Sequence, residues 1–247
     1  NDLLDLHRIS WPMKEALSSL DISAVVRELQ ALIGGHIDKI YHPSLDHLVL
    51  AIRRPGEGKT FLHFVVGRWL YLSEEGGEMP AQPSDFAMML RKRVLNARVT
   101  GIRQQGFDRI VVLTLDKDGA FELVLESFGD GNVILVRDGT IIQPLTSHTW
   151  KHRDVRAKRA FVFPPPIPDP LTMSPEELLG VLGSSNTDLV RTLATKLNMG
   201  GTYSEEVCAR SGVAKDARAA GISLDDAVMI LKSARSLRDE ILSSGKG

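Results

Sequence analysis

Hydrophobic and polar positions predict a helix near the start of the chain. The apolar residues of this helix recur every three or four positions, at Ile22, Val25, Val26, Leu29 and Leu32. Ser18, with Asp21 three positions later, has the spacing of a capping box and predicts where the helix begins. Gly34-Gly35 predicts where it ends. Such a helix packs by one face.

Between residues 37 and 142 the pattern changes to that of strands, with turn residues between them. The predicted strands are residues 37–41, 47–52, 61–66, 69–72, 98–104 and 110–115, and two more follow. Residues 116–119 and 137–140 both contain Asp-Gly, which tolerates the positive φ angles of hairpin turns. In the strand after the first of these turns, Phe121, Leu123 and Leu125 alternate with their neighbours, so one face belongs to the core.

A second helix interrupts these strands. Ser84 is its predicted N-cap, and its apolar stripe consists of Phe86, Met89, Leu90 and Val94. Arg91, Lys92 and Arg93 leave that stripe, so we expect them to point mostly to water. The turn at residues 96–97 leads into the next strand, and Gly106 reverses the chain before the strand of residues 110–115.

Helical patterns return after a proline-rich stretch, residues 164–170, which cannot continue a ladder or a helix. Ser174-Pro-Glu-Glu177 is a strong start signal, and a second helix is predicted from about residue 186 to residue 197. Residues 198–202 form a hinge, with Thr202 and Glu205 as the next expected capping box. A last helix runs from Ser223 to about residue 242.

The predicted organisation is therefore α+β: an antiparallel β-sandwich flanked by helices over residues 13–163, a linker over residues 164–170, and an all-α domain over residues 171–247. Residues 1–12 show no periodicity and are set aside as a leader, either a remnant of expression or a misassigned start.

Composition and charge narrow the class of protein. The 247 residues are 43% hydrophobic and carry a net charge of -1, so affinity for a polyanion must come from clustered charge. Residues 85–114 hold six Lys or Arg against two Asp, and residues 151–159 hold five against one, although such runs are usually solvated surface. The single cysteine, Cys208, is expected to fill a core position. With no long apolar run and no signal peptide, we expect a cytoplasmic protein that does not contact a membrane.

Catalytic and metal-binding motifs are absent from the sequence. The seven histidines lack zinc-ligand spacing, and the Gly-x-Gly at residues 129–131 is not followed by a helix, which argues against a dinucleotide loop. We therefore expect no cofactor, no metal and no enzymatic activity. Gly200-Gly201, between two predicted helices, is either a plain tight turn or a helix-hairpin-helix that presents N–H groups to a phosphate.

Several segments resemble the NFACT family, also called fibronectin-binding protein A-like, over about residues 13 to 245. The resemblance is carried by Pro83-Ser-Asp-Phe-Ala-Met-Met-Leu-Arg-Lys92, by Gln104 with Asp108-Arg109, by the opening Ser18 and Asp21 with residues 37–41, by residues 128–136, and by Leu197-Asn-Met-Gly-Gly-Thr-Tyr-Ser-Glu-Glu-Val207. It implies an N-terminal fragment of an archaeal-type member, whose coiled coil and further RNA-binding domain lie beyond this chain. It also implies a first domain similar to the N-terminal domain of formamidopyrimidine-DNA glycosylases, followed by a helix-hairpin-helix domain.

The same resemblance implies a function in ribosome-associated quality control. A member of the family binds a large ribosomal subunit that still carries peptidyl-tRNA, and it recruits aminoacyl-tRNA, typically charged with alanine, to extend the stalled chain without a template. Asp21, Asp108 and Arg109 match positions needed there for tRNA binding. We add Arg91, Lys92, Arg93, Arg103, Gly200 and Gly201 as expected phosphate contacts.

Plainer interpretations and other functions stay open at this point. In the plainer interpretation, Asp21 is no more than part of a helix cap, and Asp108 and Arg109 form an ion pair at the end of a hairpin. A DNA glycosylase would need a terminal proline nucleophile, for which only Pro12 is a candidate. A surface adhesin, as the older family name suggests, conflicts with the missing signal peptide.

Overall fold

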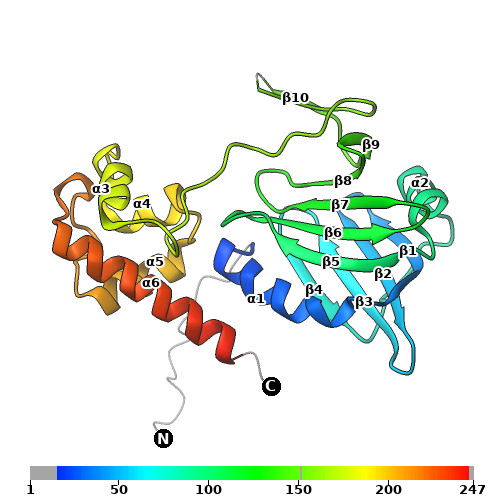
Figure 1. Cartoon of the computed structure of the whole chain (residues 1–247), viewed down its shortest axis with the longest axis horizontal. Coiled ribbons are helices and arrows are strands. Elements are labelled where there is room, and N and C mark those ends of the chain that lie inside the picture. The colour runs from blue at the N-terminus through cyan, green and yellow to red at the C-terminus, as the bar shows by residue number, and fades with distance from the viewer. Residues whose placement is uncertain (1–15, 151, 245–247) are drawn as a thin grey trace, which may run out of the picture.

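The computed structural model describes residues 16–150 and 152–244. The leader predicted at residues 1–12, including Pro12, lies outside these residues. The chain forms a sheet-containing part and a helical part, which Figure 1 shows on opposite sides of the first helix, α1 (Ser19–Leu29). Helix α1 begins at its predicted cap and is prolonged by a short 3-10 turn, η1 (Gln30–Leu32).

Nine strands form one antiparallel sheet in the order β4-β3-β2-β1-β5-β6-β7-β8-β9. Their bounds are β1 (His36–Ser44), β2 (His47–Arg54), β3 (Gly58–Val65), β4 (Trp69–Ser73), β5 (Arg98–Gln104), β6 (Ile110–Asp116), β7 (Ala120–Glu126), β8 (Asn132–Arg137) and β9 (Thr140–Pro144). Most neighbours in this order are also neighbours in sequence, because tight turns join them. The exception is the junction of β1 with β5.

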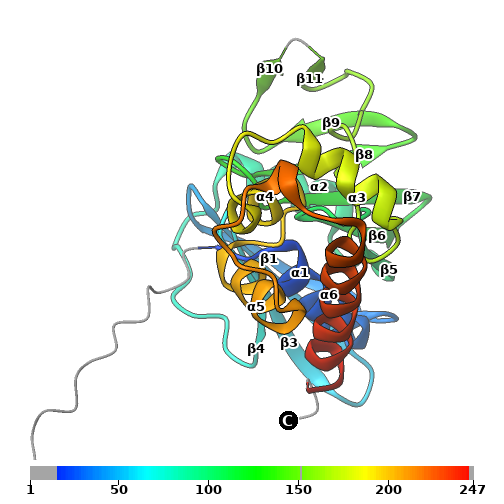
Figure 2. The same ribbon diagram turned by 90° about the vertical axis from the view of Figure 1, so that its left-hand side faces the viewer.

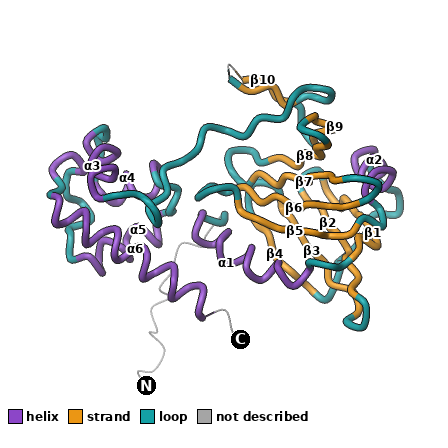
Figure 3. The backbone as a smooth tube through the Cα atoms, in the orientation of Figure 1, coloured by secondary structure: helices purple, strands orange, loops and turns teal. Residues whose placement is uncertain are grey.

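The two layers of the predicted sandwich are the two halves of this one sheet. Strands β1 and β5 pair in register only at His36 and Arg98. Beyond that point the sheet bends, and Figure 3 shows strands β1–β4 facing strands β5–β8. One core cluster accordingly contains buried side chains from both halves, such as Leu50 of β2 and Leu123 of β7. The predicted α+β fold class is confirmed.

Helix α2 (Asp85–Val94) lies between β4 and β5 in the sequence and has its predicted N-cap, Ser84. Its predicted stripe faces the core, with Phe86, Leu90 and Val94 buried. Lys92 and Arg93 are exposed, as expected. The expectation for Arg91 is wrong, because its Nε and Nη2 atoms donate hydrogen bonds of 2.9 and 2.6 Å to the carbonyl of Ile40.

A small hairpin was not predicted. It consists of β10 (His148–Trp150) and β11 (Arg153–Val155), which form a separate two-stranded sheet among the described residues. In the sequence these residues overlap a run of charged residues. Strands of three residues are also too short to show an alternating pattern. Residues 164–169 then form neither helix nor strand, consistent with the predicted connector.

The helical part contains α3 (Pro175–Gly183), α4 (Leu189–Lys196), α5 (Gly201–Ser211), a 3-10 turn η2 (Ala219–Gly221) and α6 (Leu224–Ser244). Helix α4 begins three residues later than predicted, since the side chain of Asp188 caps it by accepting from the N–H of Arg191. The capping box predicted at Thr202 is wrong: α5 begins at Gly201, which places Thr202 inside the helix. Cys208 is buried, and burial raises the pKa of its thiol to about 11, as expected for core filler.

Helix α1 connects the two parts. Its Ile22 and Leu29 belong to the core of the sheet, whereas its Leu20 is buried in the core of the helical part. Phe107, from the turn between β5 and β6, is buried in that second core as well. Figure 2, turned by 90°, again shows α1 beside α5 and α6. Among residues 16–150 and 152–244, no helix combines the length and apolar content that crossing a bilayer requires.

Candidate nucleic-acid interface

Asp21 lies where the sheet part meets the helical part. One of its carboxylate oxygens, Oδ2, accepts hydrogen bonds from the backbone N–H and the hydroxyl of Ser18, at 2.6 and 2.7 Å. The other, Oδ1, accepts from the hydroxyl of Tyr203 on α5, at 2.7 Å. Burial and the adjacent carboxylate raise the pKa of Tyr203 well above its usual range. Asp21 therefore caps α1 and also ties it to the helical part.

Asp108 is the second acid at this junction, and it is only 8% exposed. Its Oδ1 atom accepts from the backbone N–H of Arg109 at 2.7 Å and from the side-chain amide of Asn198 at 3.1 Å. The loss of hydration on burial raises the pKa of this carboxyl above its ordinary value. Asn198 also accepts, through its backbone carbonyl, from the N–H of Ser19 at 3.2 Å. The loop before α5 is thus held against both α1 and the β5–β6 turn.

Arg109 is placed differently from the two acids. Its side chain is half-buried, and its Nε atom is buried without a hydrogen-bond partner among residues 16–150 and 152–244. Burial lowers the pKa of the guanidinium, which stays charged because arginine titrates far above neutral pH. The simple ion pair with Asp108 is not found in the described part of the chain, where the Asp108 carboxylate accepts from a backbone N–H and an amide. Arg109 retains donors for a ligand.

The start of α5 faces the same space. Gly200 precedes the helix with φ of 75°, a left-handed conformation that favours glycine, and no side chain caps the helix there. In the described chain, the backbone N–H groups of Gly201 and Thr202 make no hydrogen bond to another backbone group. These N–H groups carry the partial positive charge of a helix N-terminus, which attracts anions.

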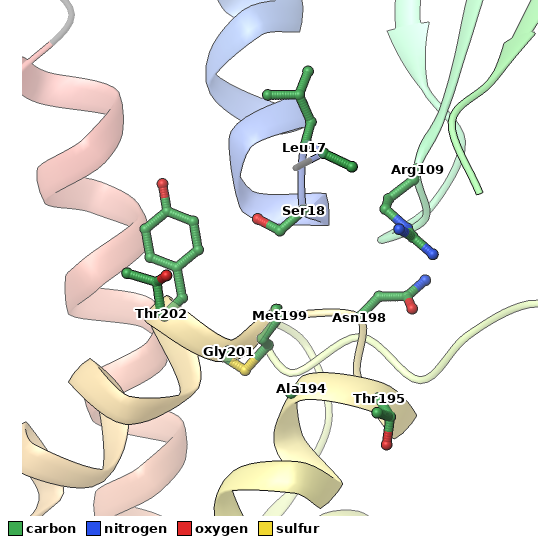
Figure 4. Close-up of a pocket in the computed structure, with 12 residues that line it drawn as sticks. Leu17, Ser18, Arg109, Ala194, Thr195, Asn198, Met199, Gly201 and Thr202 are labelled. Atoms are coloured by element: carbon green, nitrogen blue, oxygen red, sulfur yellow. The ribbon is translucent and has the colours of Figure 1, made fainter. Parts of the chain in front are cut away.

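A hollow of about 360 Å³ lies between these elements. Its lining includes Ser18 of the α1 cap, Arg109 of the β5–β6 turn, and Asn198, Gly200, Gly201 and Thr202 of the α4–α5 connection. Figure 4 shows the Arg109 and Asn198 side chains pointing toward one another across it. Such a combination of a guanidinium with helix N–H groups suits a phosphate or another anion. No metal-holding group of three or more His, Cys, Asp or Glu occurs within the described ranges.

The structure brings together five of the nine predicted site residues: Asp21, Asp108, Arg109, Gly200 and Gly201. Arg109, Gly200 and Gly201 line the hollow, whereas Asp21 and Asp108 hydrogen-bond to lining residues, Tyr203 and Asn198. The other four predicted residues, Arg91, Lys92, Arg93 and Arg103, are not in its lining. The first three belong to α2, at the far side of the sheet in Figure 1. Arg103 on β5 pairs with Glu122 on β7, two strands away in the sheet, at 3.1 Å. A phosphate contact by any of the nine stays a prediction, as does the helix-hairpin-helix interpretation of the α4–α5 connection.

Asn198 and Tyr203 were missed as members of the site. Both lie in the 197–207 segment, but their partners, Asp108 and Asp21, are 90 and 182 residues away in the sequence. Periodicity and capping rules connect residues only a few positions apart, so neither contact has a signal in the sequence.

Comparison with known proteins agrees with this architecture. Over 247 aligned residues, the chain is 33% identical to an archaeal Rqc2 homolog, aRqcH, of Methanocaldococcus jannaschii; the match covers 95% of this chain and 36% of that protein. It is 36% identical over 145 residues to ribosome quality control complex subunit 2 of Saccharomyces cerevisiae, covering 58% of this chain and 14% of the relative. The chain therefore spans well under half the length of these relatives.

Solved structures show the same fold. The N-terminal part of the fibronectin/fibrinogen-binding protein of Streptococcus suis superposes with a TM-score of 0.70 at 24% identity, covering 91% of this chain and 85% of that one. The MutM (Fpg) protein of Thermus thermophilus superposes with a TM-score of 0.52 at 14% identity, covering 93% and 77%. The predicted likeness to the formamidopyrimidine-DNA glycosylase fold is thus confirmed.

A family model described as the NFACT N-terminal and middle domains matches residues 18–245. That range includes the α1 cap, the β5–β6 turn and the α4–α5 connection that line the hollow. The chain belongs to the NFACT family.

Proposed function

We propose that this chain is the RNA-binding N-terminal part of a ribosome-associated quality-control factor, and that the junction hollow holds a phosphate of tRNA. The name of the yeast relative, ribosome quality control complex subunit 2, supports this class of function. Membership of the NFACT family over residues 18–245 supports it further.

The wider activity is proposed for the longer protein. It binds large ribosomal subunits that carry peptidyl-tRNA, in the cytoplasm, and recruits aminoacyl-tRNA, typically alanyl-tRNA, for template-free extension of the stalled chain. In this proposal the chain itself makes and breaks no bonds. Its contribution is to bind the tRNA.

One observation carries the proposal: the guanidinium of Arg109 is partly desolvated, has a buried Nε atom without a hydrogen-bond partner in the described chain, and lines the hollow at the N-terminus of α5. Partial loss of hydration is unfavourable for the charged guanidinium, so an anionic ligand that accepts hydrogen bonds from it is stabilised in the hollow. A tRNA phosphate would accept from Arg109 and from the N–H groups of Gly201 and Thr202. Asp21 and Asp108 then act by holding the three elements together.

The test is the substitution Arg109→Ala in this chain, with tRNA binding measured by fluorescence anisotropy at several salt concentrations. We expect affinity to fall about tenfold, because one charge-assisted contact with a phosphate is lost. The plot of log K against log salt concentration should become less steep by about one unit, which is the change expected when one phosphate contact is lost. The melting temperature should change little, since the described chain gives the Nε atom of Arg109 no partner to lose.

Arg53→Ala is a matched control. Arg53 is 58% exposed and pairs with Asp38 on β1, so its loss should leave tRNA affinity within about twofold and cost at most about 1 kcal/mol. Equal affinity of the wild type and the Arg109→Ala variant would contradict the proposal. Cleavage of a duplex containing an oxidised base, or binding to fibronectin in place of RNA, would favour the glycosylase or the adhesin interpretation.

A further inference from the structure

The β10–β11 hairpin presents a tryptophan that the hollow at the junction does not use. Trp150 is 51% exposed, and its ring lies beside that of His148, with centroids 5.0 Å apart. Figures 1 and 2 both show the hairpin projecting from the sheet, away from α1 and α5. An exposed tryptophan leaves a large apolar ring in water, and covering that ring with a partner is favourable.

The hairpin is firmly anchored in spite of its small size. Arg153, directly opposite Trp150, forms a two-pronged ion pair with Glu126 of β7, in which the side chains are only 10% and 3% exposed. Its Nε atom also donates to the carbonyl of Val162 at 2.7 Å. Val155 is buried against the outer face of β6–β8. The strand that pairs with Trp150 is therefore fixed to the sheet by these contacts.

A second hollow, of about 260 Å³, lies under the hairpin. Phe128, His148 and Trp150 supply its aromatic walls, and residues 129–132 supply a glycine-rich loop on the other side. Two of the polar side chains in its lining are hydrogen-bonded within the protein, Glu126 to Arg153, and Asn132 to Val133 and Thr146. A third, Asp130, is exposed at the glycine-rich loop. The hollow thus offers ring surfaces more than specific polar contacts, which suits a flat group such as a nucleobase.

Positive charge follows directly along the chain. Arg156, Lys158 and Arg159 are exposed, and Asp154 is the only acid among residues 151–159. Three backbone hydrogen bonds pin their loop to residues 139–141, with N···O distances of 2.7 to 2.8 Å. Asp154 pairs with Arg156 and Arg159 but can neutralise only one charge. A positive loop held beside an aromatic hollow matches the phosphate and base of a single nucleic-acid strand.

We propose that the β10–β11 hairpin is a second RNA contact, in which an unpaired base of single-stranded RNA stacks on Trp150 and its phosphates lie along residues 156–159. The inference rests on the proposed RNA-binding function and adds a surface separate from the junction hollow. Stacking on an aromatic ring is tolerant of sequence, so this contact holds unpaired RNA without selecting bases.

The test uses the whole chain and a fluorescein-labelled, unstructured oligouridine at low salt. Trp150→Ala should weaken binding about tenfold, and Trp150→Phe, which keeps a ring, less than about threefold. Lys158→Glu should weaken binding and reduce its salt dependence. Lys232 is an exposed lysine on α6, and Lys232→Glu should change the affinity less. Saturating RNA should quench the tryptophan emission of the wild type, and most of that quenching should disappear in Trp150→Phe.

The outcomes separate the two proposals. If Trp150→Ala binds within about twofold of the wild type while Arg109→Ala binds weakly, the hairpin contact is wrong and the junction site stands. Unchanged emission of the wild type at saturating RNA also overturns the hairpin contact. If the wild type binds neither tRNA nor oligouridine, the proposed function fails and this inference fails with it.

Discussion

At the residue scale, the two acids and the arginine of the junction have different roles. Both carboxylate oxygens of Asp21 accept hydrogen bonds inside the protein, and so does Oδ1 of Asp108. Arg109 alone of the three keeps a buried donor atom without a partner in the described chain. We therefore expect substitutions of the acids to disturb the shape of the hollow, and substitution of Arg109 to remove a contact with the ligand.

Asp108→Asn should change how stability depends on pH. Burial raises the folded-state pKa of Asp108 above the ordinary aspartate value of about 3.9. The folded protein therefore favours the protonated carboxyl. The stability gained in this way is fully present below about pH 4, and it is lost as pH rises through the raised folded-state pKa. Asparagine does not ionise, so the substitution removes this loss.

The measurement is urea unfolding of both proteins across the acidic to neutral range. The free energy of unfolding of Asp108→Asn minus that of the wild type should increase as pH rises through this window and then level off. A difference that stays constant with pH, or that decreases, would contradict the assigned burial of the ionised carboxylate.

At the scale of elements, the turn between α4 and α5 sets the geometry of the hollow. Gly200 has φ of 75° and ψ of 160°, and a Cβ atom there would lie 3.1 Å from the Cβ of Ser18. Gly200→Ala should therefore lower the free energy of unfolding by about 1–3 kcal/mol, through backbone strain and crowding. It should also weaken tRNA binding, because the start of α5 must shift away from α1.

Gly183→Ala is the control for this change. Gly183 is the last residue of α3, and a Cβ atom added there has no neighbour within 4 Å. Alanine restricts the unfolded chain and favours the helix, so stability should stay within about 1 kcal/mol of the wild type or increase. Urea unfolding measures both variants, and equal stability of the two would show that the Gly200 conformation is not required.

At the scale of the whole molecule, two cores share α1 and the β5–β6 turn. Phe107 is 3% exposed and lies in the core of the helical part, although it belongs to the sheet part by sequence. Phe107→Ala should lower the free energy of unfolding by about 3–5 kcal/mol by opening a cavity at this shared contact. It should also separate the unfolding of the helical part from that of the sheet.

Calorimetry checks this prediction, with Phe86→Ala as the control. Phe86 is 9% exposed and lies in the core of the sheet, so its loss should lower stability without separating the two parts. We expect one transition in the wild type and in Phe86→Ala, and two in Phe107→Ala. A single transition in all three would mean that Phe107 does not couple the parts.

Much of the fold could be predicted because its signals are local. The caps at Ser18, Ser84 and Ser174 all form as expected, since each depends on residues three positions away. The hinge before α5 was placed correctly, but its cap was not, because the left-handed conformation of Gly200 moves the helix start to Gly201. Arg91 was wrongly assigned to water, because its acceptor lies on β1, 51 residues away.

The sequence by itself determined where helices and strands form, and it marked Asp21, Asp108, Arg109, Gly200 and Gly201 as candidates. Only the tertiary structure decided that these five residues surround one junction, that Arg91, Lys92, Arg93 and Arg103 lie elsewhere, and that Trp150 is presented on a hairpin. Capping, turn and periodicity rules act over a few residues. The junction depends instead on hydrogen bonds between residues 90 and 182 positions apart, which form only when the two cores pack against α1.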